Sequence, residues 1–188
     1  MNDLSDTIHE SVELAKESKL NSYIAVTVAI SATFMAVCNI KDGNIVQGMS
    51  QAQAHTVNSW SYFEAKSTKQ MITENTLLLL QTNNSGATQT IKNLEAKIAR
   101  YQVEKEEIKN KAVAFEQEYN DLNVFDDQFD MTDAFLSIAI ALFGITALTQ
   151  KKWLFYFAAG LSSAGLFFGI TAFLQVPVHF GWISKVLG

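Results

Sequence analysis

Hydrophobic residues along this chain gather in two zones, and a long charged stretch separates them. The first zone runs from about residue 20 to residue 40, and the second from residue 131 to about residue 176. A soluble domain mixes apolar and charged residues on the scale of a helical turn, whereas a membrane protein segregates them along the chain. The pattern therefore predicts an all-α integral membrane protein.

Three segments within these zones are long and apolar enough to cross about 30 Å of hydrocarbon. They are transmembrane helices predicted over residues 20–40, 131–148 and 153–174. The short polar stretch 149–152 forces the second and third spans into a tight antiparallel pair. A cap on the first turn of the second span is expected from one of the polar residues Asp130, Thr132 and Asp133.

Residues 41–130 are predicted to form a long extramembrane antiparallel hairpin of two helices. The sequence Asn-Asn-Ser-Gly near residues 83–86 is its turn signal. In the second arm, apolar residues recur at alternating steps of three and four from Ile91 to Leu122, which is the pattern of a coiled coil. The first arm, about residues 45–81, is less regular.

The residues expected to pack this hairpin, or to bind a partner, come from both arms. The first arm contributes an aromatic cluster with an adjacent cation, formed by Trp60, Phe63 and Lys66. The second arm contributes Ile98, Ile108 and Phe115, together with Lys105 as the one polar residue in the apolar register. A lysine at such a position either extends its ammonium group out of the seam or sets the number of subunits at a cost in stability.

Small residues in the second and third spans are expected to allow close helix packing within the membrane. They are Gly160, Ala164 and Gly165 in the third span, with Gly144 in the second span facing them. Span one offers a similar series, Ala25, Ala29, Ala32 and Ala36. These faces and the hairpin predict self-association.

The remaining segments flank the spans. Residues 1–19 are expected to form an amphipathic N-terminal segment, and residues 175–188 an interfacial C-terminal tail. The short loop that carries Lys151 and Lys152 should be cytoplasmic by the positive-inside rule. Three spans then place the N-terminus in the cytoplasm and the hairpin in the periplasm or outside the cell.

Composition and motifs indicate no catalytic activity and no cofactor. The net charge of −5 argues against nucleic acid as a partner, and Cys38 as the one cysteine excludes an intramolecular disulfide. The three histidines are far apart, and no nucleophile motif or phosphate-binding loop occurs. A cluster of aspartates before the second span could bridge a divalent cation, although capping and solvation explain it more simply.

The stretch Asn58–Lys69, NSWSYFEAKSTK, resembles a bacterial membrane family known as domain of unknown function 4337. The matching positions are Trp60, Phe63, Ala65, Lys66 and Ser67. The resemblance implies one N-terminal span, a charged coiled segment, two adjacent spans and a bacterial source. It implies no catalytic residue.

The expected function is that of a structural or interaction protein of the bacterial inner membrane. Its expected partners are the lipid bilayer, further copies of the same chain and another membrane protein. The alternative is an oligomeric channel or transport component, in which the hydroxyls of Thr27, Ser31 and Thr33 line a pore. The competing explanation for these hydroxyls is hydrogen bonding to the backbone of their own helix.

Overall fold

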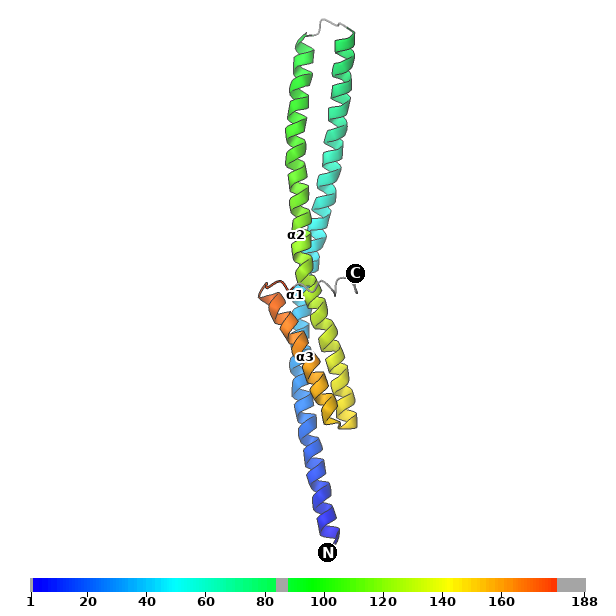
Figure 1. Ribbon diagram of the computed structural model, residues 1–188, viewed down its shortest axis with the longest axis vertical. Coiled ribbons are helices and arrows are strands. Elements are labelled where there is room, and N and C mark those ends of the chain that lie inside the picture. The colour runs from blue at the N-terminus through cyan, green and yellow to red at the C-terminus, as the bar shows by residue number, and fades with distance from the viewer. Residues whose placement is uncertain (1, 84–87, 179–188) are drawn as a thin grey trace. The chain divides into compact units, whose positions relative to one another are not determined.

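The computed structural model describes residues 2–83 and 88–178, with side chains from residue 19 onward. These residues form three helices: α1 spans Asn2–Thr82, α2 spans Thr88–Thr149 and α3 spans Lys152–Phe173 (Figure 1). The described part of the chain contains no strand, so the prediction of an all-helical protein is confirmed. The predicted turn at Asn84–Gly86, the side chains of the N-terminal segment and the tail beyond residue 178 lie outside the described residues.

Each helix contains a stretch that is long and apolar enough to cross a membrane. The prediction that the second span begins with its own helix cap is wrong, because α2 passes through residues 130–133 without interruption. The Thr132 hydroxyl instead donates a hydrogen bond to the Gln128 carbonyl within the helix. No proline lies in this region, and the run of helix-compatible residues gives the backbone no reason to stop.

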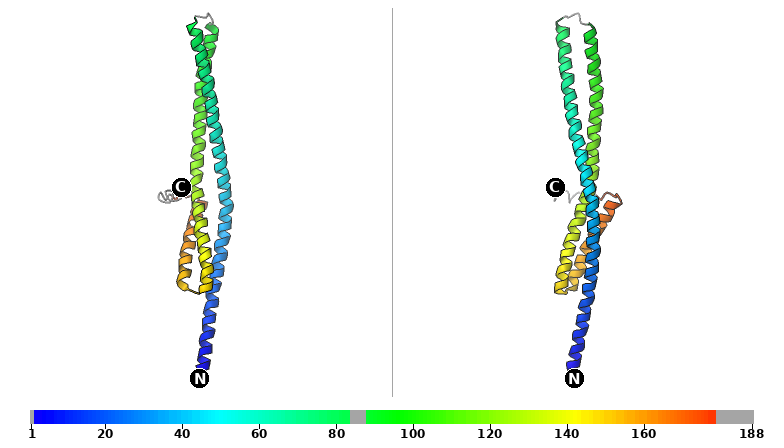
Figure 2. Two further views of the ribbon diagram at one scale, coloured as in Figure 1. Left: turned by 90° about the vertical axis from the view of Figure 1, so that its right-hand side faces the viewer. Right: turned by 180° about the vertical axis from the view of Figure 1, so that it is seen from behind.

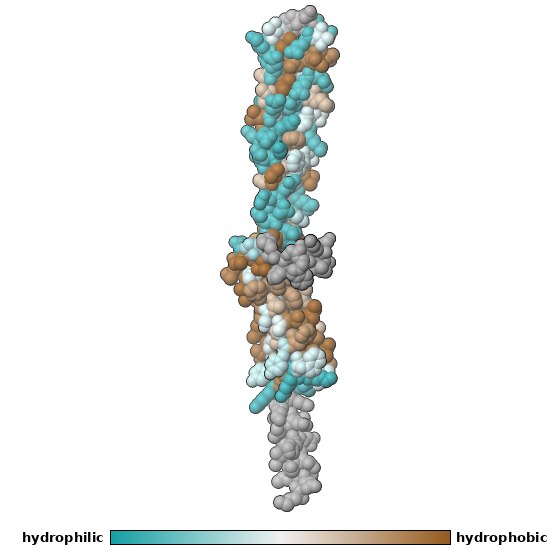
Figure 3. All heavy atoms as spheres, viewed as in Figure 1, coloured by the Kyte–Doolittle hydropathy of each residue, from teal (hydrophilic) through white to brown (hydrophobic). Residues whose placement is uncertain are grey.

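The chain divides into two compact units. Unit 1 comprises residues 1–46 and 123–188, and unit 2 comprises residues 47–122. Figure 3 shows hydrophobic residues covering much of the visible face of unit 1, whereas hydrophilic residues dominate unit 2.

In unit 1, α2 and α3 pack antiparallel against each other. They are joined by Gln150 and Lys151, and Gln150 adopts a positive φ of 56° at this turn. The Phe135 and Phe168 rings stack with centroids 5.8 Å apart, and Phe143 lies 5.6 Å from Phe155. The apolar stretch of α1 contributes Ile24, which is buried in one cluster with Phe143 of α2 and Ala158 of α3.

In unit 2, the distal part of α1 lies beside the first half of α2, as the two views of Figure 2 show. Along α2, buried and half-buried residues recur at steps of three and four. They are Ile91, Leu94, Ile98, Tyr101, Lys105, Ile108, Ala112, Phe115, Tyr119 and Leu122. Apart from Glu104, the α2 residues between Thr88 and Asp121 that lie off this register are exposed. The residues that follow the alternating register therefore form one face of the helix, as heptad geometry requires.

Candidate interaction surfaces

The predicted packing residues of α2 lie on the face that meets α1 within unit 2. Ile108 is buried, and Ile98 and Phe115 are half-buried. The Phe115 ring stacks on the His55 ring of α1, with centroids 4.9 Å apart. Lys105 is half-buried, and its ammonium group lies 5.2 Å from the centroid of the Phe63 ring. This lysine therefore stays in the seam over an aromatic face, a favourable position for a cation.

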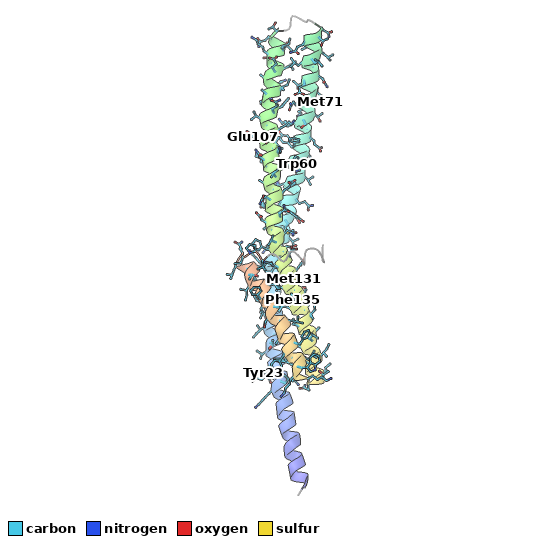
Figure 4. All side chains as sticks on the ribbon, in the orientation of Figure 1. Tyr23, Trp60, Met71, Glu107, Met131 and Phe135 are labelled. Atoms are coloured by element: carbon cyan, nitrogen blue, oxygen red, sulfur yellow. The ribbon has the colours of Figure 1, made fainter. Side chains whose placement is uncertain are left out.

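The predicted residues of α1 lie opposite them. Trp60, labelled in Figure 4, donates its indole N–H to the Glu116 carboxylate at 2.8 Å. Lys66 forms an ion pair with Glu104 of α2, and its side chain is only 13% exposed. The Lys66 ammonium group also lies 5.4 Å from the Tyr62 ring centroid and 5.3 Å from the Tyr101 ring centroid. An aromatic and charged layer thus ties the two helices together at mid-length.

The Lys66–Glu104 pair favours the charged form of both groups. The hydrogen bond from Lys66 lowers the pKa of the Glu104 carboxyl, and the same bond raises the pKa of the Lys66 ammonium group. Arg100 lies 3.4 Å from the same carboxylate as an i,i+4 partner on α2. The hydrogen bond between Lys66 and Glu104 thus favours the ion pair, and we expect the pair to fix the register of the two helices.

Sequence periodicity missed most of the α1 side of this seam. Eleven buried and half-buried residues of α1 follow a heptad register. They are Ile45, Met49, Ala52, Thr56, Ser59, Phe63, Lys66, Gln70, Thr73, Leu77 and Leu80, and Gly48, Trp60 and Ser67 are half-buried outside this register. Five of the eleven are polar, so a search for apolar repeats fails here. Val46 and Met71, which hydrophobicity alone marks as core, are 46% and 55% exposed.

Only part of the predicted small-residue patch of unit 1 lies in a close contact between helices. A side chain added at Gly165 would lie 2.8 Å from Leu136 Cγ and 3.2 Å from Phe135 Cβ, so this glycine lets α3 approach α2 closely. Ala164 is half-buried beside it. Gly160 and Gly144 meet nothing within 4 Å, so the expectation that Gly144 faces the patch is not met within one chain.

Two close contacts between α1 and α3 were not predicted from the sequence. The hydroxyls of Ser31 and Ser162 are buried and lie 2.9 Å apart, so one donates to the other. A side chain at Gly169 would lie 2.5 Å from Phe34 Cε1 and 3.1 Å from Cys38 Sγ. Small and hydroxyl residues are too common in apolar helices for spacing alone to identify these contacts.

The hydroxyls proposed to line a pore are occupied. Thr27 donates to the Tyr23 carbonyl and Thr33 donates to the Ala29 carbonyl, both within α1 at 2.8 Å. With Ser31 bonded to Ser162, each of the three hydroxyls has a hydrogen-bond partner, either a backbone carbonyl of α1 or a side chain of α3. The explanation by backbone hydrogen bonding is confirmed for Thr27 and Thr33.

The aspartate cluster lies just outside the apolar stretches and joins α1 to α2 within unit 1. The Asp42 and Asp126 carboxyl groups lie close enough to influence each other, and the charge of Asp130 acts on both. Burial, followed by the charges of Asp42 and Asp130, raises the pKa of Asp126 to about 6. Burial also raises the pKa of Asp42. The described residues include no group of three acidic, histidine or cysteine side chains placed to hold a metal ion.

Because folding raises the pKa of Asp126, this group stabilises the fold at low pH and loses that contribution as the pH rises through about 6. We expect the melting temperature in detergent to fall between pH 4.5 and pH 7.5. Asp126→Asn should raise it at pH 7.5 and flatten the dependence, since an amide carries no charge to bury beside Asp42 and Asp130. Asp121→Asn, at an exposed site, is the control. A melting temperature of the Asp126 variant that follows the wild type at both pH values would contradict this assignment.

Comparison with known proteins identifies the family of the chain. No curated protein and no solved structure matches the chain. A family whose description is Domain of unknown function (DUF4337) matches residues 20–175. The matched region contains the apolar stretches of all three helices, the whole of unit 2 and the aspartate cluster. The chain therefore belongs to the DUF4337 family.

Proposed function

We propose that this chain is a structural or interaction protein of a bacterial inner membrane, with three spans and an extramembrane helical hairpin. In this proposal the spans are residues 20–40, 131–148 and 153–174, and the hairpin of residues 41–130 associates as a coiled coil. The protein associates with further copies of itself, and another membrane protein is a further partner. It carries out no catalysis of its own.

The observation that carries the proposal is the uncovered apolar surface of unit 1. The most apolar windows of the three helices are only 17%, 28% and 33% buried. Large side chains such as Ile30, Leu148 and Tyr156 are 59%, 87% and 71% exposed. A surface of this kind in water would be a severe aggregation hazard, whereas in a bilayer it is the required lipid-facing surface.

Self-association is supported by small residues that a single chain leaves open. Gly144 and Gly160 meet no side chain within 4 Å, so each can admit a helix from a second copy. Native mass spectrometry in mild detergent, over a hundredfold range of concentration, should record a defined oligomer. A strict monomer at every concentration, together with no membrane partner recovered after crosslinking in native membranes, would refute the proposal.

The proposed orientation places the N-terminus in the cytoplasm and the hairpin on the other side of the membrane. It rests on the positive charges of Lys151 and Lys152 in the short loop, which are both exposed. In a Cys38→Ala background, a cysteine at Thr90 should react with a membrane-impermeant maleimide in intact spheroplasts. A cysteine at Thr149 should react only after the membrane is opened. Both side chains are exposed, so accessibility within the protein does not bias the comparison, and the reverse labelling would overturn the orientation.

The channel alternative loses support from the hydrogen bonds of span one. A pore lining needs hydroxyls that are free to replace the hydration of an ion, yet Ser31 is 1% exposed and bonded to Ser162. Ion flux through liposomes that contain the purified protein would restore this alternative.

A further inference from the structure

The two helices of unit 2 differ sharply on the faces that they turn away from each other. Between residues 88 and 122, α2 carries 13 charged residues, whereas α1 carries only four between residues 47 and 82. The outer face of α2 includes charged side chains such as Lys92, Arg100 and Glu107, all exposed. The charges of unit 2 are thus concentrated on α2, whereas the corresponding face of α1 carries few of them.

The outer face of α1 has a heptad register of its own. Its central positions step by four and three, and every one is uncharged. They are Ala54, Asn58, Ser61, Ala65, Thr68, Ile72, Asn75, Leu79 and Thr82. All nine are exposed in the single chain. We call these residues the second seam of α1.

Large apolar side chains strengthen this second seam toward the distal end of α1. Ile72 and Leu79 are 58% and 63% exposed, and the flanking Met71 and Leu78 are 55% and 62% exposed (Figure 4 labels Met71). Leu77 and Leu80 of the same leucine run are half-buried toward α2. The run therefore supplies two apolar faces, of which one is used within the chain.

We propose that the second seam of α1 is the interface for the α1 helix of a second copy, in parallel and in register. This inference deepens the proposed function and rests on it. Two copies inserted in one membrane with the same topology run their α1 helices in the same direction, so the contact must be parallel. The lack of charge along the seam lets two identical faces meet without burying like charges.

The charges that flank the seam select the same arrangement. Glu64 and Lys69 lie on opposite edges of the second seam, five residues apart. In a parallel two-stranded coiled coil, a residue on one edge faces the residue five positions later on the opposite edge of the partner helix. Glu64 of each copy therefore meets Lys69 of the other. Both are exposed, and neither makes an ion pair with another described residue.

Crosslinking in native membranes tests the interface. In a Cys38→Ala background, single cysteines at Thr68 and at Asn75 should each form a disulfide-linked dimer under mild oxidation, because a parallel contact places each residue opposite its own copy. Cysteines at Asn93 and Asn110 serve as matched controls, since both are exposed on the outer face of α2. We expect at least fivefold more dimer at the α1 sites.

Reversing the charges at the edges of the second seam is the second test of the interface. Glu64→Lys and Lys69→Glu should each lower the dimer yield from the Asn75 cysteine severalfold, because each brings like charges together across the interface. The double variant Glu64→Lys/Lys69→Glu should restore the yield. Circular dichroism of each variant controls for helix content.

The outcomes separate this interface from self-association in general. An oligomer in native mass spectrometry with crosslinks at Asn93 or Asn110, and none at Thr68 and Asn75, would overturn the second seam and leave the proposed function standing. Crosslinking at Asn75 but not at Thr68 would indicate an antiparallel contact and would also overturn it. A strict monomer without crosslinks would remove the proposed function as well.

Discussion

Replacing Ile108 by aspartate should loosen unit 2 by about 3 kcal/mol or more, because the change removes a buried apolar side chain and leaves a charge in its place. Ile108 is 8% exposed on the face of α2 that meets α1. The loss should appear as rapid proteolysis of residues 47–122 in detergent, at protease concentrations that leave the wild type intact.

The matched control for this prediction is Asn110→Asp, two residues along the same helix. Asn110 is exposed, so its conversion to aspartate should cost less than about 0.5 kcal/mol. Equal protease resistance in the Ile108→Asp and Asn110→Asp variants would show that the two helices do not stabilise each other through this face.

The second large effect is expected at Gly165. A leucine at this position would force atoms into Leu136 Cγ and Phe135 Cβ. Phe135 Cβ is fixed to the α2 backbone and cannot rotate away, and Leu136 is fully buried, so it has little space to change its rotamer. We expect α3 to be displaced from α2, at a cost of about 3 kcal/mol, the upper end for overpacking. The melting temperature in detergent should fall steeply.

Gly160→Leu, one and a half turns earlier on α3, is the matched control for the fold. Nothing lies within 4 Å of a side chain added there, and leucine favours a helix over glycine by about 0.8 kcal/mol. The melting temperature of this variant should hold or rise, while its self-association through the spans should weaken. A Gly165→Leu variant as stable as Gly160→Leu would contradict the packing of α3 on α2.

The sequence predicted the helical class and the apolar segments well because these depend on composition over long windows. The α2 register was also accessible, since Ile91, Ile98 and Ile108 fall in one alternating register of three- and four-residue steps. Residues 130–133 do not begin a helix as predicted, although their acidic and hydroxyl side chains resemble the start of one. In α2 their backbone groups continue the helix, and the Thr132 hydroxyl donates a hydrogen bond to the Gln128 carbonyl of the preceding turn.

The α1 side of the seam was not predictable from hydrophobicity. Its central positions include Thr56, Gln70 and Thr73, and polar residues at such positions look the same in sequence as exposed ones. The Lys66–Glu104 pair depends on the alignment of two helices separated in sequence, which no local pattern encodes. The same reason hid the contacts of Gly169 with Phe34 and of Ser31 with Ser162.

The central claim is that three apolar segments cross a bilayer while unit 2 stays in water. Spin labels at single cysteines measure this directly, through their accessibility to oxygen, which concentrates in lipid, and to a water-soluble nickel chelate. Labels at Ile30, Ile138 and Ser163, each exposed near the middle of an apolar segment, should be far more accessible to oxygen in proteoliposomes. Labels at Asn93 and Asn110 in unit 2, both exposed on the outer face of α2, should be more accessible to the nickel chelate. High nickel accessibility at any of the first three positions would contradict the three-span account.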